Sequence, residues 1–499
     1  MRMMRQLKHV VLAAIGAVAL SGTAARAQQQ QQQEPPDTQQ GQPQGQQQGE
    51  QPVAPIPAIR SPLAGASDNG DTNDAQELTP DTRSLTGAEN LSLGTMTPTH
   101  SYWQPHLSLA VTLDSNPEYS TGSSGWGTWT SLLGGVDIHR ISGVSDMLVS
   151  YTGGGMFSNG GAAENGIIQQ FAFTDKFTFR RSTFSVFEQL NYLPESSFGF
   201  SGLTGAGLPG SGGLGGLGTG FTPGQSILTP RGQNLTSSTA IEYDNKLTPR
   251  ASLTFVGGYS LLHYFENDLA DYGGVNFQAG YNYQLTRQDT IAVSYLFNGI
   301  RYSDLNQSIN ANTIQGSYAR RVTGRLAFQI AAGPQIVSST SPITGTTPSS
   351  GSGTSSITAL YWSLNSSLHY QLRRAALSAS YSHGVTGGSG VLAGAESDIV
   401  SGSVGEQVTR TFNLQWNAGY SRNKGFALGT NTSSQTLGYW FTGVNVTHPF
   451  GRSLDVFMNY QLQYEDTNTN TCVGTGCSTS LIRNQIEFGV NLHKQPIPF

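Results

Sequence analysis

The residues best suited to acid–base chemistry are one histidine and three carboxylates that lie close together in the chain, His263, Glu266, Asp268 and Asp271. A histidine beside a carboxylate can act as a general base toward a lipid or a peptide, and His383 offers a second such group. Neither group is accompanied by a serine nucleophile motif or by paired histidines at metal-binding spacing. Such loose spacing is more typical of a solvated surface, so we expect no enzyme activity and assign no catalytic residue.

Two other short motifs resemble loops that bind a nucleotide or a calcium ion. The stretch Gly210 to Gly215 reads G-x-G-x-x-G, but it lies in a glycine-rich region with no helical pattern after it. A dinucleotide site needs a strand before these glycines and a helix behind them. The acidic run Asp68 to Asp74 lacks the bidentate glutamate and flanking helices of a calcium loop. We therefore expect no metal ion and no cofactor.

The N-terminus has the three parts of a secretory signal peptide. Arg2, Arg5 and Lys8 precede an apolar run that is too short to span a bilayer, and residues 25–27 form an A-x-A cleavage site. Removing residues 1–27 deletes four positive charges and no negative ones, which moves the formal charge from −5 to −9. Such a charge argues against a nucleic-acid partner.

Export would determine the redox state of the two cysteines, Cys472 and Cys477. They are separated by Val-Gly-Thr-Gly in a polar segment. An oxidising compartment favours a short disulfide loop between them. A metal site would need further ligands, and no histidine lies in this segment. The sequence therefore predicts a Cys472–Cys477 disulfide.

Composition separates residues 28–100 from the remainder of the chain. Gln, Pro and Gly dominate the first part of this segment, and Asp, Asn, Thr and Ser follow, so it has little to bury and we expect it to be disordered. The whole chain is 36% hydrophobic and 11% charged, with 62 glycines and 10% aromatic residues. A β-barrel with a lipid-facing exterior and a polar interior requires this mixture.

From residue 101 onward, apolar and polar residues alternate with a period of two, as in β-strands. In the last stretch, Ile486, Phe488, Val490 and Leu492 alternate with polar residues or glycine. Two prolines follow in 494–499, so we expect the C-terminal Phe499 to lie in a short extension beyond the last strand.

Short turns rich in Thr, Pro, Gly and Arg recur on one side of the strands, and longer Ser-, Asn- and Gly-rich connections on the other. Counting from these turns predicts about eighteen strands, or sixteen if the weakest strand near 398–408 is lost with its turn. An even count places both chain ends on the short-turn side. We predict an all-β, antiparallel up-and-down transmembrane barrel over residues 101–499.

This combination of alternating strands and unequal turns resembles porin-like bacterial outer-membrane β-barrels, without the signature of one named family. The resemblance implies an outer-membrane location with residues 28–100 in the periplasm, contact with outer-membrane lipids and insertion by the barrel-assembly machinery. Homo-oligomers are also compatible with it. A barrel of this size leaves an aqueous channel unless a domain plugs it, and residues 28–100 are too polar to fold into one.

We therefore expect passive diffusion or export of small polar solutes. The alternative is a non-conducting surface barrel that acts as an enzyme, an adhesin or a structural protein. By resemblance to trimeric porins, the longest connection, 194–232, is the candidate constriction, and a mobile surface loop is the alternative. Its candidate lining residues are Phe198, Phe200, Leu203 and Phe221. The candidate lumen-wall residues are His369, Gln415, Asp455, Glu465 and Glu487.

Overall fold

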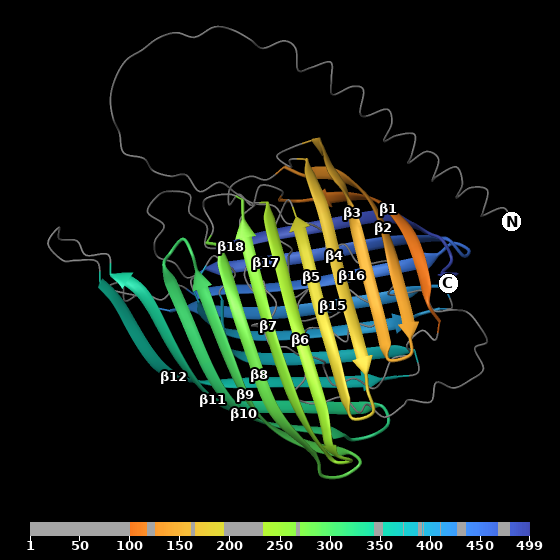
Figure 1. Ribbon diagram of the computed structural model, residues 1–499. Helices are drawn as coiled ribbons and strands as arrows, with labels where there is room; N and C mark the ends of the chain where they lie inside the picture. The colour runs from red at the N-terminus through yellow and green to blue at the C-terminus, as the bar shows by residue number, and fades with distance from the viewer. Residues whose placement is uncertain are drawn as a thin grey trace, which may run out of the picture. The chain divides into compact units, whose positions relative to one another are not determined.

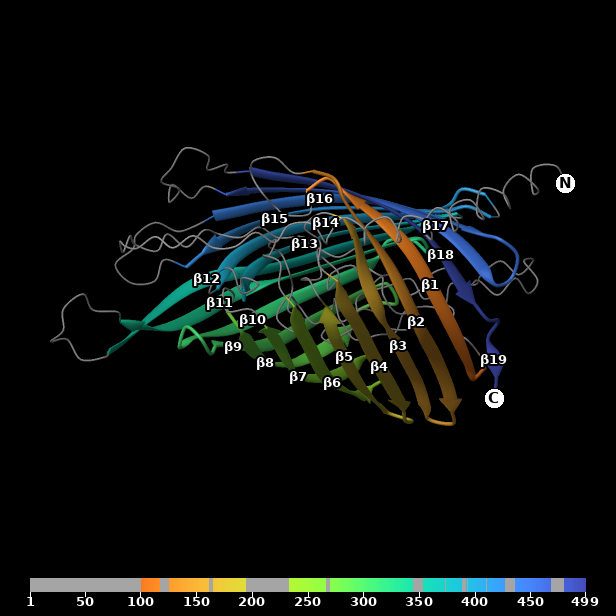
Figure 2. The same ribbon diagram turned by 90° about the horizontal axis from the view of Figure 1, so that it is seen from above.

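A computed structural model describes residues 100–116, 125–160, 165–193, 233–265, 270–343, 353–372, 374–387, 392, 394–409, 411–426, 436–467 and 480–499. These residues form one antiparallel sheet that closes on itself as a barrel, because each strand pairs with the next and β1 pairs with β18. Figures 1 and 2 show the barrel from two directions. No helix in the described ranges is long and apolar enough to cross a membrane.

The strands of the barrel wall have the following bounds: β1 Tyr102–Asp114, β2 Gly127–Ser142, β3 Ser145–Gly160, β4 Gly166–Thr178, β5 Ser182–Leu193, β6 Asn234–Thr248, β7 Ala251–Tyr264, β8 Tyr272–Gln284, β9 Asp289–Tyr302, β10 Gln307–Arg321, β11 Leu326–Ile343, β12 Gly353–Gln371, β13 Ala375–Thr386, β14 Ala395–Gln407, β15 Asn413–Gly425, β16 Thr436–Pro449, β17 Leu454–Thr467 and β18 Ser480–His493. The prediction of eighteen strands is confirmed, and the weakest of them, near 398–408, is β14.

The alternation in the sequence becomes an apolar exterior and a polar interior. In β18, Phe488 is 49% exposed, whereas its neighbour Glu487 is 7% exposed and faces inward. Every strand of the wall except β13 carries a large exposed apolar side chain within the described ranges. The buried, inward set is rich in uncharged polar side chains: Gln104, Thr112, Ser131, Asn234, Thr254, Asn276, Gln278, Thr313, Gln335, Ser401, Asn423 and Gln463.

Threonines explain why the short turns have similar sequences. Thr286, Thr323 and Thr409 each accept hydrogen bonds at Oγ1 from the backbone N–H groups two and three residues later. This local bond satisfies amides that the strand ladder leaves free and turns the chain sharply. Gly143 and Gly451 have φ of 52° and 79° and take the left-handed positions of two other short turns.

The C-terminal extension differs from the prediction. β18 ends at His493, but Ile497–Pro498 forms a further short strand, β19, against the start of β1. Phe499 N also donates to Ser101 O at 3.4 Å. The expectation that two prolines would prevent further pairing was wrong, because β1 is an available edge at this point and a two-residue ladder needs few N–H donors. Both ends of the barrel chain thus lie together on the short-turn side.

Candidate pore and constriction

The five lumen-wall candidates lie on inward-facing positions. Glu487 is buried, and Asn459 Nδ2 donates to its Oε2 at 3.5 Å. Asp455 lies near the short-turn end of β17, with Oδ2 3.5 Å from His493 Nδ1. The alternation of exposed and covered side chains places the other three on the inner side of β12, β15 and β17: His369, Gln415 and Glu465. Their part in solute passage stays a prediction.

A polar cluster on β1–β3 was not anticipated. His106 Nδ1 lies 3.1 Å from Asp137 Oδ2, and both side chains are 1% exposed. On its other side, His106 Nε2 is 3.1 Å from Thr152 Oγ1, two strands away. The residue between them is Gly135, where an added Cβ would lie 2.3 Å from His106 Nε2. The missing side chain at Gly135 is therefore what lets the imidazole lie flat along the inner wall.

A segment between β13 and β14 leaves the wall and turns into the barrel. β12 pairs with β13 as far as Leu364↔His383, although β12 itself begins at Gly353. Beyond His383, β13 pairs with β14 alone. Val385 N donates to Oε1 of Gln335, an inward-facing residue of β11, at 3.1 Å. We call the described residues 384–387, 392 and 394–397 the inner hairpin, because Val385 lies against the inner face of β11.

The tip of the inner hairpin contacts the inner faces of strands far from its own. Tyr302 on β9 donates a hydrogen bond to the Gly387 carbonyl. Gly394, with φ of 89°, packs so closely on Ile309 of β10 that a Cβ would lie 2.1 Å from its Cδ1. The tip also forms an apolar cluster with Leu437 of β16 through Leu392 and Ala395. The hairpin therefore reaches from the β9–β10 side of the lumen to the β16 side.

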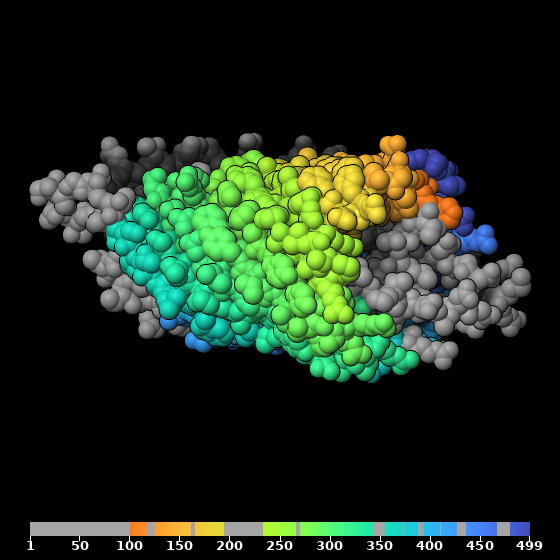
Figure 3. All heavy atoms as spheres, turned by 60° about the horizontal axis from the view of Figure 1, so that its bottom comes forward, coloured from red at the N-terminus to blue at the C-terminus, as the bar shows by residue number. Residues whose placement is uncertain are grey.

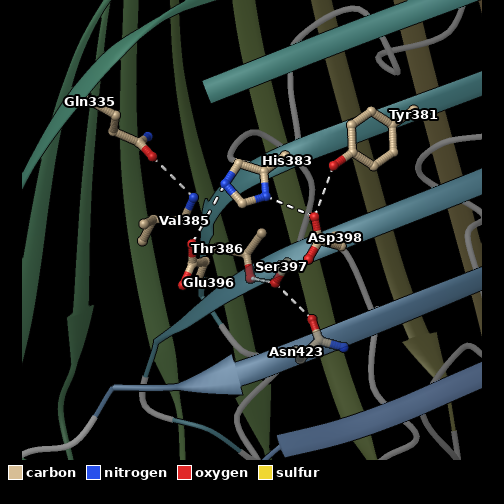
Figure 4. A network of polar contacts seen from close by, with 9 residues as sticks. All are labelled: Gln335, Tyr381, His383, Val385, Thr386, Glu396, Ser397, Asp398 and Asn423. Atoms are coloured by element: carbon tan, nitrogen blue, oxygen red, sulfur yellow. Dashed lines mark hydrogen bonds and ion pairs between the residues drawn. The ribbon is translucent and has the colours of Figure 1, made fainter. Parts of the chain in front are cut away.

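A polar network fixes the point where the hairpin leaves the wall (Figure 4). His383 Nδ1 is 2.7 Å from Asp398 Oδ1, and its Nε2 is 3.6 Å from Glu396 Oε1. Tyr381 OH donates to the same Asp398 oxygen at 2.9 Å. The imidazole also stacks on the indole of Trp362, with ring centroids 3.8 Å apart. These contacts hold β13 to β14 and β12 at the last position where all three strands meet.

The two ends of the lumen differ in chemistry. Around the inner hairpin, at the end with long connections, an apolar cluster includes three inward-facing tyrosines, Tyr264, Tyr272 and Tyr302, together with Val385. A second apolar cluster, on β2–β5, lies at the same end and contains Trp129, Leu133, Met156, Ile168 and Leu193. The short-turn end carries the His106–Asp137 cluster and Asp455. The long-connection end therefore combines these apolar clusters with buried polar groups such as Arg483 and Asp114, whereas the described inward side chains named at the short-turn end are polar.

The predicted constriction residues Phe198, Phe200, Leu203 and Phe221 lie outside the described residues, and so do Cys472 and Cys477. The inner hairpin is a segment of the described residues that turns into the lumen, and our sequence reasoning did not single it out. Its signals were present: the adjoining strand near 398–408 had the weakest pattern, and Gly384, Gly387 and Gly394 are closely spaced. Those signals indicate an irregular segment but do not say whether it turns inward or outward.

At the rim, the His263 cluster has a structural explanation. His263 contacts the Asp271 carboxylate through its Nδ1, and Asp271 Oδ1 accepts a hydrogen bond from Tyr264 N at 2.7 Å. Asp271 N donates to Asp304 Oδ2 at 3.1 Å. These bonds tie together the ends of β7, β8 and the β9–β10 turn. Glu266 and Asp268 lie outside the described residues.

No protein-family model matches the chain, and no curated protein matches its sequence. Similar solved structures include OccAB1 of Acinetobacter baumannii, with 10% identity, a TM-score of 0.40 and coverage of 79% of this chain and 96% of that one. OpdQ of Pseudomonas aeruginosa has 11% identity and a TM-score of 0.39, covering 80% and 99%. OccK2 (OpdF) of the same organism, in complex with glucuronate, has 10% identity and a TM-score of 0.38, covering 79% and 98%.

Proposed function

We propose that this protein is an outer-membrane channel for the passive diffusion or export of small polar solutes. The observation that carries the proposal is the distribution of side chains on the closed barrel. Large apolar residues such as Leu360 and Phe488 face outward, and buried polar residues such as Gln104, Asn276 and Gln463 face inward. A closed barrel satisfies all its backbone hydrogen bonds without water, which a chain crossing a bilayer requires. A barrel of this strand number encloses a lumen wider than its own side chains fill.

The predicted signal peptide supports an outer-membrane location. It directs export, and no long apolar run would retain the chain in the inner membrane. The chain end before β1 lies on the short-turn side, which faces the periplasm in barrels of this kind. We therefore place residues 28–100 in the periplasm and the long connections at the cell surface. Lipids of the outer membrane and the barrel-assembly machinery would be its partners there.

The inner hairpin would set the size of what can pass. It bears tyrosine and aliphatic contacts on its described part, and the network of His383, Glu396 and Asp398 holds its base to the wall. The hairpin narrows the surface end, so a slim solute passes more readily than a bulky one. The polar inner wall disfavours solutes that are apolar throughout, because such a solute would displace water from the wall without replacing the hydrogen bonds that the water makes there.

Planar-bilayer recording of purified, folded protein tests the proposal. We expect discrete single-channel steps whose conductance scales with electrolyte concentration, as for a water-filled pore. A folded barrel, shown by a β-type circular dichroism spectrum and by slower migration on gels before heating, that produces no steps over many insertions would contradict it. That result would favour the non-conducting surface barrel instead.

A further inference from the structure

A groove lies on the outer wall of the barrel, where β11 to β15 run side by side. Its volume is about 880 Å³, within the range of about 300–1,000 Å³ that small-molecule sites occupy. Its lining includes the exposed side chains of Leu368, Tyr370 and Trp416. Figure 3 shows the outer wall from lime-green β6 to teal β12, the strand that carries Leu368 and Tyr370. The groove therefore faces the surroundings of the barrel and not its lumen.

The strand register explains why the wall is hollow here. Ala379 on β13 pairs with Gly402 on β14, and Gly402 pairs with Ala418 on β15. Ala379 also pairs with Leu368, which is 44% exposed, so this row of small residues lies on the outward face. Three neighbouring strands thus present almost no side-chain volume at the same level of the sheet.

Larger side chains border the row of small residues on both sides. Toward the long connections, Tyr381 pairs with Val400, and Val400 pairs with Tyr420. Toward the short turns, Val404 pairs with Trp416. The hollow is therefore about one row of side chains wide and has apolar or aromatic borders.

The end of the groove at the short turns is polar and positively charged. Thr323, Gly324 and Arg325, in the turn between β10 and β11, line it there. The Arg325 guanidinium forms no ion pair with another described residue, and none of the described residues that line the groove is acidic. Glu406 follows Val404 on the same face of β14, so a bound anion is favoured on the Arg325 side of the groove.

We propose that this groove binds one phospholipid of the periplasmic leaflet, with an acyl chain over Ala379 and Gly402 and the phosphate at Arg325. The inference rests on the proposed function, because the groove faces that leaflet only if the barrel spans the outer membrane with its short turns in the periplasm. Arginine binds a phosphate through two parallel hydrogen bonds, which fix the position of the headgroup. In the hollow, the acyl chain makes dispersion contacts that a flat wall does not offer.

Native mass spectrometry of the full-length, folded protein in detergent tests the phosphate contact. The probe is phosphatidylglycerol, and a diacylglycerol with the same acyl chains lacks the phosphate. We expect one phosphatidylglycerol to bind about tenfold more tightly than the diacylglycerol, as one charge-assisted contact would provide. Arg325→Gln should abolish this difference, whereas Arg452→Gln, in the turn between β16 and β17, should preserve it. Equal binding of the two lipids by the wild type would overturn the proposal.

Filling the hollow tests the position of the acyl chain. Ala379→Leu puts a larger side chain in the row of small residues and should weaken the binding of both lipids several-fold. Ala279→Leu is the matched control, because Ala279 on β8 pairs with the exposed Phe255 and Tyr295 on another part of the outer wall. It should bind both lipids as the wild type does. Equal binding by the two leucine variants would place the lipid elsewhere and refute the site.

Conductance of the same preparations separates this proposal from the proposed function. A conducting protein that binds the two lipids equally refutes the lipid site alone. A folded barrel that is silent in the planar bilayer but binds phosphatidylglycerol through Arg325 refutes the channel alone.

Discussion

Arg483 on β18 and Asp114 on β1 form an ion pair across the seam that closes the barrel, and neither side chain is exposed to solvent. Arg483 Nε donates to Asp114 Oδ2 at 2.6 Å, and Gln485 Nε2 donates to the same oxygen at 3.3 Å. The two residues are 369 positions apart in the chain. A pair buried to this degree ties the first strand to the last only while both partners are present.

Removing one partner of this pair should destabilise the barrel strongly. We expect Arg483→Met to lower the free energy of unfolding by about 3–5 kcal/mol, because it leaves the Asp114 carboxylate buried and uncompensated. Urea unfolding in lipid vesicles measures the effect. The double variant Arg483→Met, Asp114→Asn should recover part of the loss, and the exposed turn variant Arg452→Met should show little change. Additive losses in the double variant would contradict a direct pair.

The hydrogen bond from Tyr302 to Gly387 should hold the inner hairpin in place. Tyr302→Phe removes a bond of about 1 kcal/mol and should loosen the hairpin tip, which raises open-channel noise and mean conductance. Tyr295→Phe is the control, since Tyr295 donates to Asn312 Oδ1 on the outer wall. Identical single-channel traces for the two variants would show that the hairpin does not limit the pore.

The glycine beneath His106 should tolerate no side chain. Gly135→Ala places a Cβ 2.2 Å from the Tyr151 carbonyl oxygen and 2.3 Å from His106 Nε2, so backbone and imidazole must both move. Overpacking of this kind typically costs about 1–3 kcal/mol. Gly405→Ala is the control, because nothing lies within 4 Å of its added Cβ. Equal urea midpoints for the two alanine variants would refute the close packing.

Deleting residues 202–221 tests the longest connection as a second constriction. If this segment folds into the pore, its removal should raise single-channel conductance, because the narrowest cross-section widens. The measurement is the step size in a planar bilayer, compared with the intact chain. Unchanged conductance would leave the connection as a surface loop and the inner hairpin as the narrowing element.

The two cysteines should be joined by a disulfide in protein isolated from the cell envelope. We expect the intact mass of denatured protein to show no alkylation without a reductant and two alkyl groups after reduction. Alkylation at both positions before reduction would mean that Cys472 and Cys477 are free thiols.

Much of the fold could be predicted because its signals are local. Outward Phe488 and inward Glu487 follow from a period of two that any strand imposes on its side chains. Thr286, Thr323 and Thr409 mark turns because each hydroxyl bonds its own next residues. The inward side of His369, Gln415 and Asp455 follows from the same alternation once a barrel is assumed.

The candidate site was harder to predict because it depends on contacts between distant parts of the chain. The sequence shows Gly387 and Gly394 near an irregular strand. It does not show that Gly387 contacts Tyr302 and that Gly394 packs on Ile309 at the inner wall. His106 and Thr152 meet only because Gly135 lies between them after strands β1–β3 have paired. The C-terminal extension was misjudged for the same reason, since its partner is the start of β1.

By itself, the sequence determined the strand count, which side chains face outward and where the short turns fall, because strand periodicity and turn hydrogen bonds involve residues close in the chain. Only the tertiary structure decided that Arg483 meets Asp114, that the described residues of the inner hairpin turn into the lumen and that the chain end pairs with β1. These outcomes depend on closure of the sheet, and closure brings together residues whose separation in sequence carries no periodic signal.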